Sequence, residues 1–260
     1  MKKLSLTVLL ALSLTACASS KSMPDNTADD DALETYNRAV FEFNYQLDKA
    51  VIKPVAKGYK NVTNQFTRDR VSTFFDNLEE PAYAINNLFQ GKIKESGVSV
   101  GRFAINSTLG LLGTFDVAEG WGLNKKKNSF DATLAQYCVP DGPFVMIPVL
   151  GPATPRYLVG WAGDAYASPM YWALVDVNDS GVDAAVWSSV ALKYINIRAE
   201  SLTLTDSLEE SAVDFYATLK SAFMQNRQKF TSICAAKSNQ NNTPSYDFDF
   251  GYDDFDDDFE

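Results

Sequence analysis

The chain has 260 residues, a formal net charge of −10 at pH 7 and no histidine. Without histidine there is no general base for a Ser–His–Asp triad, so serine hydrolases of that type are excluded. The last fifteen positions hold eight acidic residues and no basic one, which leaves a net charge of about −2 on the rest of the chain. This nearly neutral body and the pI of about 4.6 argue against a basic surface for nucleic acid.

Residues 1–16 have the three parts of an export signal. Lys2 and Lys3 precede an apolar run from Leu4 to Leu14, and the segment closes with the small residue Ala16. The run is too short to span a bilayer, which needs about 20 apolar residues. We therefore predict a signal peptide that is removed on export.

Cys17 follows directly, and the ending Leu-x-Ala-Cys resembles a lipobox. We predict that the Cys17 thiol is acylated and becomes the first mature residue, because several acyl chains, at about 0.8 kcal/mol per buried methylene, give a permanent anchor. Ala18, where aspartate would retain a lipoprotein in the inner membrane, favours the outer membrane. The alternative is a plain secretory signal with an incidental cysteine. Residues 17–30, rich in Ser, Asp, Asn and Ala, are expected to form a flexible tether.

The remaining cysteines are Cys138 and Cys234. In an oxidising periplasm they could form one disulfide, which would close a long loop and stabilise the fold by about 4.7 kcal/mol in the chain-entropy model. The alternative is that both are buried as small apolar residues and never meet.

The body of the protein begins with a helical pattern. Asp31 and Glu34 have the spacing of a capping box, and we expect the helix to end near Lys53-Pro54. Its broad apolar face can contact more than one neighbour. The residues of the main stripe are three and four apart: Tyr36, Val40, Phe43, Leu47 and Val51.

Further helical segments follow, divided by proline and glycine. We predict one that stops before Pro81, a second that is closed by Gly91, and a third from Lys92 to about Thr108. No stretch shows sustained alternation of β-branched residues, so a sheet is not expected. The pattern predicts an all-α fold.

Two motifs suggest chemistry but are incomplete. Gly97, Ser99 and Gly101 match the G-x-S-x-G elbow of a lipolytic enzyme, but the histidine base and the preceding strand are missing. We interpret the two glycines as a face where helix backbones approach closely. Residues 176–181 resemble the start of a calcium loop, but Trp187 stands where the bidentate glutamate is required, so we expect a helix start and no metal or cofactor.

Taken together in order, several sequence blocks resemble the MlaA (VacJ) family of outer-membrane lipoproteins. They cover roughly residues 31–156, with a weaker echo at Arg227. The blocks are Asn37–Asn44, Leu47-Asp48, Lys53–Ala56, Arg70–Leu78, Glu80-Pro81, Asn86–Lys92, Gly101–Phe103, Asn106–Gly110, Phe115–Ala118, Gly142–Phe144, Pro148–Pro152 and Arg156.

The resemblance implies a single ring-like, all-α domain over residues 31–235, embedded in the periplasmic side of the outer membrane around an amphipathic channel. It implies a protein that is not an enzyme, and that removes mislocalised phospholipids from the outer leaflet and passes them to a periplasmic lipid carrier, in association with a trimeric porin. The alternative functions are a passive structural lipoprotein beside porins and, less favoured, a lipolytic enzyme using Ser99.

The segment from Val139 to Pro155 is predicted to be a rigid hairpin that forms part of the channel wall or its gate. Its prolines deny it regular helix, and its glycines supply bends. The alternative is a structural connector. The candidate residues are Gly142, Pro143, Phe144, Pro148, Gly151 and Pro152.

A second candidate for the gate is the turn of the first helix that carries Phe41, Phe43 and Asn44. Residues two apart on a helix point about 200° away from each other, so the two phenylalanines cannot share one core-facing stripe. We expect one of them to face acyl chains or the lumen, with the Asn44 amide at the Phe41 side of the helix. The alternative is that both rings pack and that Asn44 bonds to backbone.

Residues 236–260 end the chain, and from Tyr246 onward acidic residues alternate with aromatic ones. Charge density of this kind predicts a disordered tail. It is expected either to have no dedicated partner or to act as a ligand for a basic surface.

Overall fold

The computed structural model describes residues 33–175 and 180–239, with side chains of 174–183 and 231–239 left undescribed. The signal peptide, Cys17, the tether, Asp31, residues 176–179 and most of the acidic tail lie outside the described residues. The helices are α2 (Glu34–Leu47), η2 (Asp48–Ile52), α3 (Lys53–Val62), α4 (Gln65–Phe89), α5 (Ile93–Thr108), α6 (Val117–Gly120), α7 (Phe130–Gln136), α8 (Pro155–Ala167), α9 (Pro169–Val175), α10 (Ser180–Glu200), α11 (Leu202–Ser211) and α12 (Phe215–Asn239). The strands are β1 (Val145–Ile147) and β2 (Gly151–Ala153).

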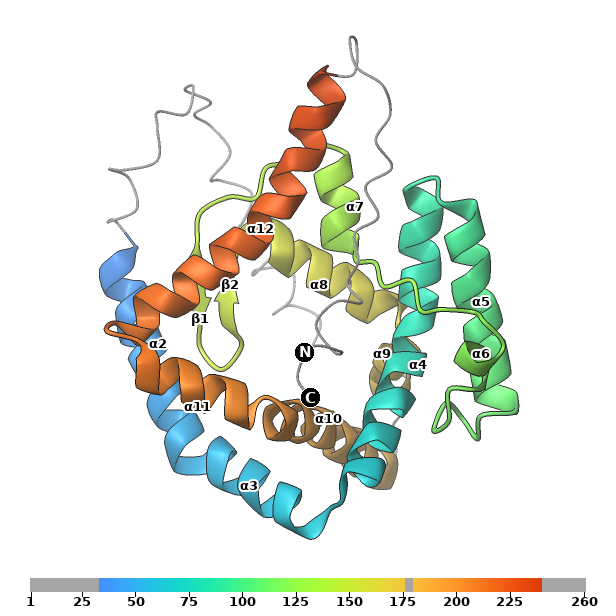
Figure 1. Cartoon of the computed structure of the whole chain (residues 1–260), viewed down its shortest axis with the longest axis horizontal. Coiled ribbons are helices and arrows are strands. Elements are labelled where there is room, and N and C mark those ends of the chain that lie inside the picture. Colours follow the sequence, from blue (N-terminus) through green and yellow to red (C-terminus); the bar gives the residue numbers. More distant parts are fainter. Residues whose placement is uncertain (1–32, 176–179, 240–260) are drawn as a thin grey trace.

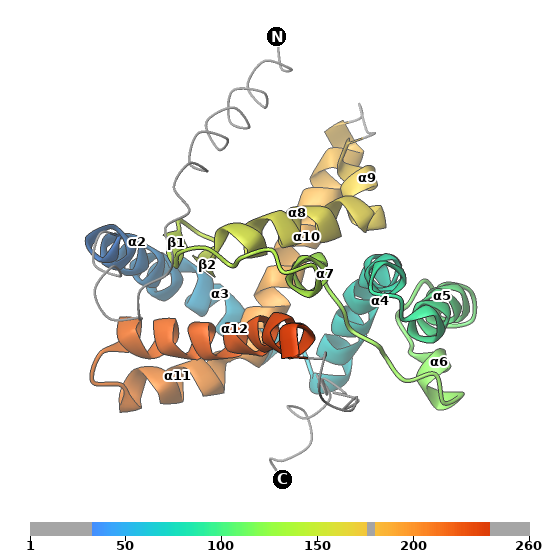
Figure 2. The same cartoon turned by 90° about the horizontal axis from the view of Figure 1, so that it is seen from above.

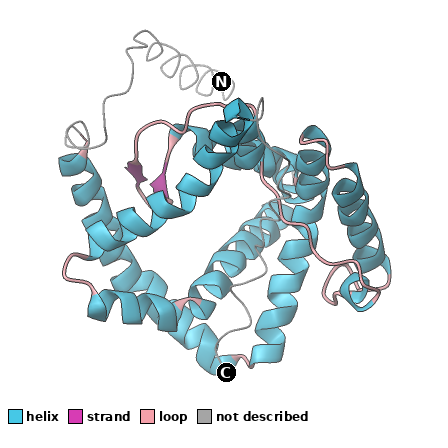
Figure 3. Ribbon diagram, turned by 45° about the horizontal axis from the view of Figure 1, so that its top comes forward, coloured by secondary structure: helices cyan, strands magenta, loops and turns pink. Residues whose placement is uncertain are grey.

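The helices are arranged as a ring, as Figures 1 and 3 show from two angles. Contacts run from α3 to α10, from α10 to α4, from α4 to α7 and from α7 to α12. A core cluster of Phe144, Met146 and Tyr216 with Val40 and Phe41 then joins α12 and the hairpin to α2 and completes the circuit. Figure 2 shows α11 and α12 on one side of the ring and α8 and α9 on the other. The predicted all-α, ring-like class is confirmed.

The first helix does not end at Pro54. A single π-helical stretch, η2, joins α2 to α3, and Pro54 lies in the first turn of α3. Lys53 N–H still bonds to the Asp48 carbonyl five residues back, so Pro54 follows directly on a widened π-helical turn, the kind of local irregularity at which a helix accommodates proline. The predicted capping box is also wrong, since Leu33 occupies the N-cap position and makes no side-chain cap bond.

The predicted break before Pro81 is wrong as well, because α4 runs through it. A proline inside a helix costs about 3 kcal/mol. Polar contacts on both sides of Pro81 hold α4 against α5. Before it, Asn77 Nδ2 donates to Ser107 Oγ at 2.9 Å and Arg102 Nε donates to Glu80 Oε1 at 2.6 Å; after it, Ser96 Oγ donates to the Ala84 carbonyl at 2.8 Å. Gly91 (φ +78°) ends the helix as predicted, in a Schellman motif with Lys92 N–H bonded to the Asn87 carbonyl.

The expectation of no sheet needs a small correction, because β1 and β2 form an antiparallel hairpin. Met146 lies opposite Pro152, and the Met146 N–H points away from β2 to Asn37. The pair is therefore not hydrogen-bonded across the strands, and the missing N–H of Pro152 costs the ladder nothing. Three residues are too few to show the alternation that identifies a strand in sequence.

The G-x-S-x-G segment lies within α5, and Ser99 is completely buried. The predicted close helix approach at Gly97 and Gly101 is wrong: a Cβ at Gly97 would meet nothing within 4 Å, and one at Gly101 only Leu123 at 3.7 Å. The close approach occurs instead where α8 crosses α7. A Cβ on Gly160 would lie 2.5 Å from Asp131, and one on Gly163 2.6 Å from Phe130.

Candidate functional site: a hairpin clamped to the first helix

Two asparagines of α2 bind the backbone of the hairpin. Asn37 donates through Nδ2 to the Phe144 carbonyl at 3.2 Å and accepts through Oδ1 from Met146 N–H at 2.7 Å. Asn44 repeats the pattern, donating to the Ile147 carbonyl at 2.9 Å and accepting from Val149 N–H at 2.7 Å. Each side-chain amide therefore bonds to a carbonyl and to the N–H two residues later, Asn37 along β1 and Asn44 across the turn that follows it.

The separation of the two asparagines along α2 matches the separation of their partners along the hairpin. Asn37 and Asn44 are seven residues apart, which is about 10.5 Å along a helix at 1.5 Å per residue. Their carbonyl partners, Phe144 and Ile147, are three residues apart, which is about 10 Å of extended chain at 3.4 Å per residue. The two rises match, so both amides bond at once and fix the register of the hairpin on α2.

Phe41 and Phe43 face opposite ways, as helix geometry requires. Phe41 packs edge to face against Phe215 at 5.6 Å and Tyr216 at 5.5 Å between ring centroids. Phe43 is 53% exposed. Asn44 bonds to the backbone of the hairpin, as the alternative of simple packing expects. The same alternative expects both phenylalanine rings to be packed, and the exposed Phe43 ring contradicts it.

The tip of the hairpin is apolar and strained. Val149 is 66% exposed and has φ of +69°, a left-handed conformation that β-branched residues rarely adopt. Leu150 is also exposed, and Gly151, at φ +87°, takes the second positive angle without a Cβ. Pro148 precedes this turn. The hydrogen bond from Val149 N–H to Asn44 is the contact that holds the strained residue in place.

The base of the hairpin is held by the rest of the ring. Gly142, at φ +83°, touches Pro155, and a Cβ there would lie 2.9 Å from the proline ring. Pro143 leads into Phe144, which is 3% exposed and packs against Tyr216 and Phe223 of α12. Phe144 is therefore a core residue of the hairpin base and does not face an open path.

A buried ion network fixes this base, and sequence reasoning missed its acids. Arg227 of α12 makes two bonds of 2.9 Å to Asp131 of α7, and Arg156 Nε binds the same carboxylate at 2.9 Å. Arg227 Nε also binds Asp141 at 2.7 Å, and Thr154 donates to Asp141 at 2.6 Å. Burial alone would raise the pKa of Asp141, but the bonds from Arg227 and Thr154 outweigh it and hold that pKa below its ordinary value.

A second buried network supports the opposite wall. Arg102 of α5 bonds to Glu80 of α4 and, at 2.5 Å, to Asp116, whose other oxygen accepts from Asn106. Burial raises the pKa of Glu80 despite its bond with Arg102. Residues from four of the resembling sequence blocks thus meet in one cluster. Their spacing in sequence gave no sign of this, because each pair joins different elements.

Cys138 is disulfide-bonded, and its partner lies outside the described side chains. Cys138 follows α7 directly and has φ of +61°. The side chain of Cys234, in the last turns of α12, is not described. The predicted pairing of these two cysteines therefore stays a prediction.

Among the described residues many polar and charged side chains are buried beside the apolar core, whereas many large apolar side chains are exposed. Among the described residues no helix is long and apolar enough to cross a membrane. The described residues likewise contain no cluster of acidic, cysteine or histidine side chains able to hold a metal ion. Buried polar residues include Asn37, Arg68, Asn77, Glu80, Asn86, Asn87, Arg102, Asn106, Asp131, Arg156 and Arg227; exposed apolar ones include Val62, Phe66, Ile93, Leu109, Leu111, Leu112, Trp121, Val159, Trp161 and Trp187.

Comparison with known proteins shows the family to which this chain belongs. A family model described as MlaA lipoprotein matches residues 29–230. The chain is 34% identical to the intermembrane phospholipid transport system lipoprotein MlaA of Haemophilus influenzae, over 86% of this chain and 88% of that one. It is 32% identical to the Escherichia coli protein of the same name, over 82% of each.

Similar proteins also include one from Rickettsia bellii, described only as uncharacterised, at 36% identity over 76% of this chain and 75% of that one. A solved structure described as "Structural basis for maintenance of bacterial outer membrane lipid asymmetry" matches with a TM-score of 0.63 and 30% identity, covering 81% of this chain and 100% of the other. On these grounds the chain belongs to the MlaA lipoprotein family.

Proposed function

We propose that this protein removes mislocalised phospholipids from the outer leaflet of the outer membrane and passes them to a periplasmic lipid carrier, so that the membrane keeps its lipid asymmetry. The names of the Haemophilus and Escherichia relatives support phospholipid transport. The observation that carries the proposal is the ring of helices closed by a clamped hairpin, with charged and amide side chains buried between its elements and many large apolar side chains exposed on their surface. An apolar exterior suits contact with acyl chains.

In this proposal the protein is anchored through acylated Cys17 and lies in the periplasmic side of the outer membrane. Its partners are membrane phospholipids, a trimeric outer-membrane porin and a periplasmic phospholipid-binding shuttle protein. Exposed apolar residues on α5 and the segment after it, such as Leu109, Leu111 and Leu112, offer a surface for membrane or porin contact.

The hairpin tip and the exposed face of α2 form the gate in this account. Asn44 links them, because its amide bonds to the backbone on both sides of Pro148. Phe43 lies on the exposed face of the same helical turn. A change in this turn would alter how freely lipid enters the path, and would not simply abolish transport.

Two alternatives make different predictions. A passive structural lipoprotein would leave lipid asymmetry intact when its gene is deleted, whereas the transporter leaves excess phospholipid in the outer leaflet. A lipolytic enzyme would need an accessible serine, and Ser99 is buried within a helix. Purification from native membranes, with identification of the bound proteins and lipids, tests the proposal: a porin, a periplasmic carrier and phospholipid are expected, and their absence counts against it.

A further inference from the structure

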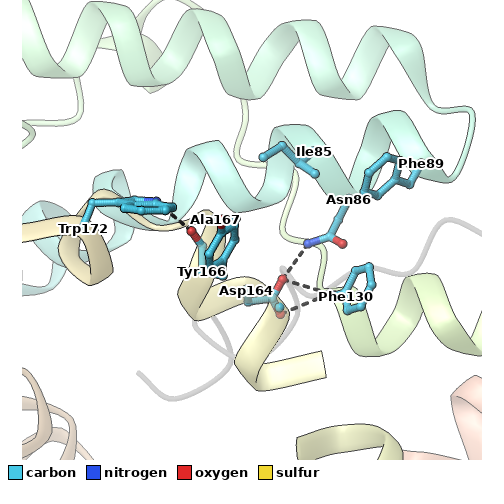
Figure 4. A pocket seen from close by; sticks show the side chains of 9 residues that line it. Ile85, Asn86, Phe89, Phe130, Asp164, Tyr166, Ala167 and Trp172 are labelled. Atoms are coloured by element: carbon cyan, nitrogen blue, oxygen red, sulfur yellow. Dashed lines mark hydrogen bonds between the residues drawn. The ribbon is translucent and has the colours of Figure 1, made fainter. Parts of the chain in front are cut away.

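A pocket of about 490 Å³ lies where α4, the start of α7, α8 and α9 meet. Figure 4 shows its side chains: Asp164 points into it beside Phe130, Asn86 lies across from the carboxylate, and Tyr166 and Trp172 form the far side. The volume is within the range of small-molecule sites, about 300–1,000 Å³. Its lining is mostly apolar and aromatic, with one acidic group.

The acid of this pocket has only neutral hydrogen-bond donors. Asp164 Oδ1 accepts from Asn86 Nδ2 at 2.6 Å and from Phe130 N–H at 2.9 Å, while Oδ2 has only the longer contact of 3.1 Å to the same N–H. Among the described residues no basic side chain pairs with Asp164. A carboxylate accepts about four hydrogen bonds, so Oδ2 keeps acceptor capacity toward the pocket.

Apart from burial, the charged groups that most raise the pKa of Asp164 are acidic. Glu79 and Asp131 both raise its pKa, and each already has its own basic partner: Lys193 for Glu79, and Arg156 and Arg227 for Asp131. Burial is the largest cause and, with these neighbours, raises the pKa of Asp164 to about 6. At neutral pH the pocket therefore holds an anion without a counterion from the described part of the chain.

The aromatic walls favour the same kind of ligand. The rings of Tyr166 and Trp172 meet edge to face at 4.9 Å between centroids, and Trp172 Nε1 bonds to the Tyr166 carbonyl at 3.0 Å, which fixes this corner. Phe89 and Phe130 supply further rings. Aromatic faces attract organic cations, and aromatic corners beside a carboxylate are a recurrent way to bind ammonium groups.

We propose that this pocket binds the ammonium group of an amphipathic molecule, with the cation between the Asp164 carboxylate and the aromatic rings. This inference rests on the proposed function in one respect, because it names an aminophospholipid headgroup as the source of the ammonium. It makes the protein selective for lipids with an amine headgroup over anionic ones. A free amine such as ethanolamine is the other source of the same chemistry.

Calorimetric titration of the purified full-length protein in a non-ionic detergent tests the proposal. The probes are dihexanoyl phosphatidylethanolamine, dihexanoyl phosphatidylglycerol and ethanolamine, each at pH 7.5 and pH 5. We expect saturable binding of the ethanolamine lipid at pH 7.5, at least tenfold tighter than the glycerol lipid, and weaker binding at pH 5, where Asp164 is protonated. If ethanolamine alone binds as tightly as the lipid, the ammonium source is a free amine.

Asp164→Asn should weaken binding of the ethanolamine lipid at least tenfold, while Asp69→Asn, a partly exposed acid of α4 outside the pocket, should leave it unchanged. Trp172→Leu removes one aromatic wall without touching the carboxylate and should weaken binding severalfold; it carries the test if Asp164→Asn does not fold. Equal affinity for the two lipids, no saturable binding, or unchanged affinity in the folded variants overturns the proposal.

Continued clearance of phospholipid from cells without headgroup preference would refute this inference and leave the proposed function standing. Preferential binding of the ethanolamine lipid without any clearance would support this inference and refute the proposed function.

Discussion

Asn44 Oδ1 accepts a hydrogen bond of 2.7 Å from the N–H of Val149, a residue 105 positions later that is held at φ +69°. The amide nitrogen of Asn44 donates to the Ile147 carbonyl two residues before Val149. The Asn44 side chain thus holds the backbone on both sides of Pro148, where the turn at the hairpin tip begins. The position of the tip depends on this contact because its own apolar side chains are exposed.

Asn44→Ala should therefore release the tip while the ring stays folded. Two hydrogen bonds are lost, and at about 0.5–1.5 kcal/mol each we expect the free energy of unfolding to fall by about 1–3 kcal/mol. Hydrogen exchange at residues 147–151 should accelerate, and cells should show a dominant leak of phospholipid into the outer leaflet. Gln46→Ala, on the exposed side of the same helix, is the control. Global unfolding of Asn44→Ala would support a purely structural role.

Val149→Gly should stabilise the protein, because glycine adopts a positive φ without the penalty that a β-branched residue meets. Strain of this kind is worth about 1–3 kcal/mol, and part of the gain is lost to the greater backbone entropy of glycine in the unfolded chain. We expect an increase of about 0.5–2 kcal/mol, measured by denaturant unfolding. Leu150→Gly lacks this benefit, so equal effects of the two substitutions would contradict the argument.

Asp164 should make the protein less stable as pH rises. Its folded-state pKa, about 6, lies above the ordinary 3.8, so the folded protein binds the proton more tightly than the unfolded chain. Stability is then lost between about pH 4 and pH 6, by about 1–3 kcal/mol, since one pKa unit is 1.36 kcal/mol and the pocket is partly open. In Asp164→Asn this loss should disappear from the pH profile of unfolding. Asp69→Asn should follow the wild type, and a profile unchanged in Asp164→Asn would show that burial has little effect on this carboxyl.

Cys234 is the expected partner of Cys138. Arg227 contacts Asp131. Cys234 lies seven residues after Arg227 on α12, and Cys138 lies seven residues after Asp131, just past the end of α7. Peptide mapping without reduction should recover a peptide joined through Cys138 and Cys234. Cys234→Ser should expose a free thiol at Cys138 and lower stability by about 2–5 kcal/mol, with no further loss in the double variant. A peptide joining Cys138 to Cys17 would contradict both this pairing and the lipid anchor.

The local patterns predicted the helices well and their interruptions poorly. Periodic apolar residues and Gly91 depend on neighbours within a few positions, so they can be read from the sequence. The continuation of α4 through Pro81 could not, because the contacts that hold α4 just before Pro81 come from Arg102 and Ser107 on another helix. The π-helical stretch before Pro54 likewise leaves no periodic signal.

The candidate site, like the fold, could be predicted from the sequence only where neighbouring residues determine it. Opposite directions for Phe41 and Phe43 follow from helix geometry alone. The partners of Asn37 and Asn44 do not, although their spacing of seven gives two amides on one helix face and could have suggested a paired contact. The network of Asp131, Arg156 and Arg227 joins residues up to 96 positions apart, and no local pattern marks such pairs.

The central claim is that the protein clears phospholipid from the outer leaflet, and the rate of that clearance tests it most directly. A labelled phospholipid would be introduced into the outer leaflet of cells that lack the gene and of cells that express the wild type at native level. Its accessibility to a phospholipase added outside the cells would then be followed over time. The account predicts that label stays accessible without the protein and declines with it. Equal rates of decline in the two strains would contradict the account.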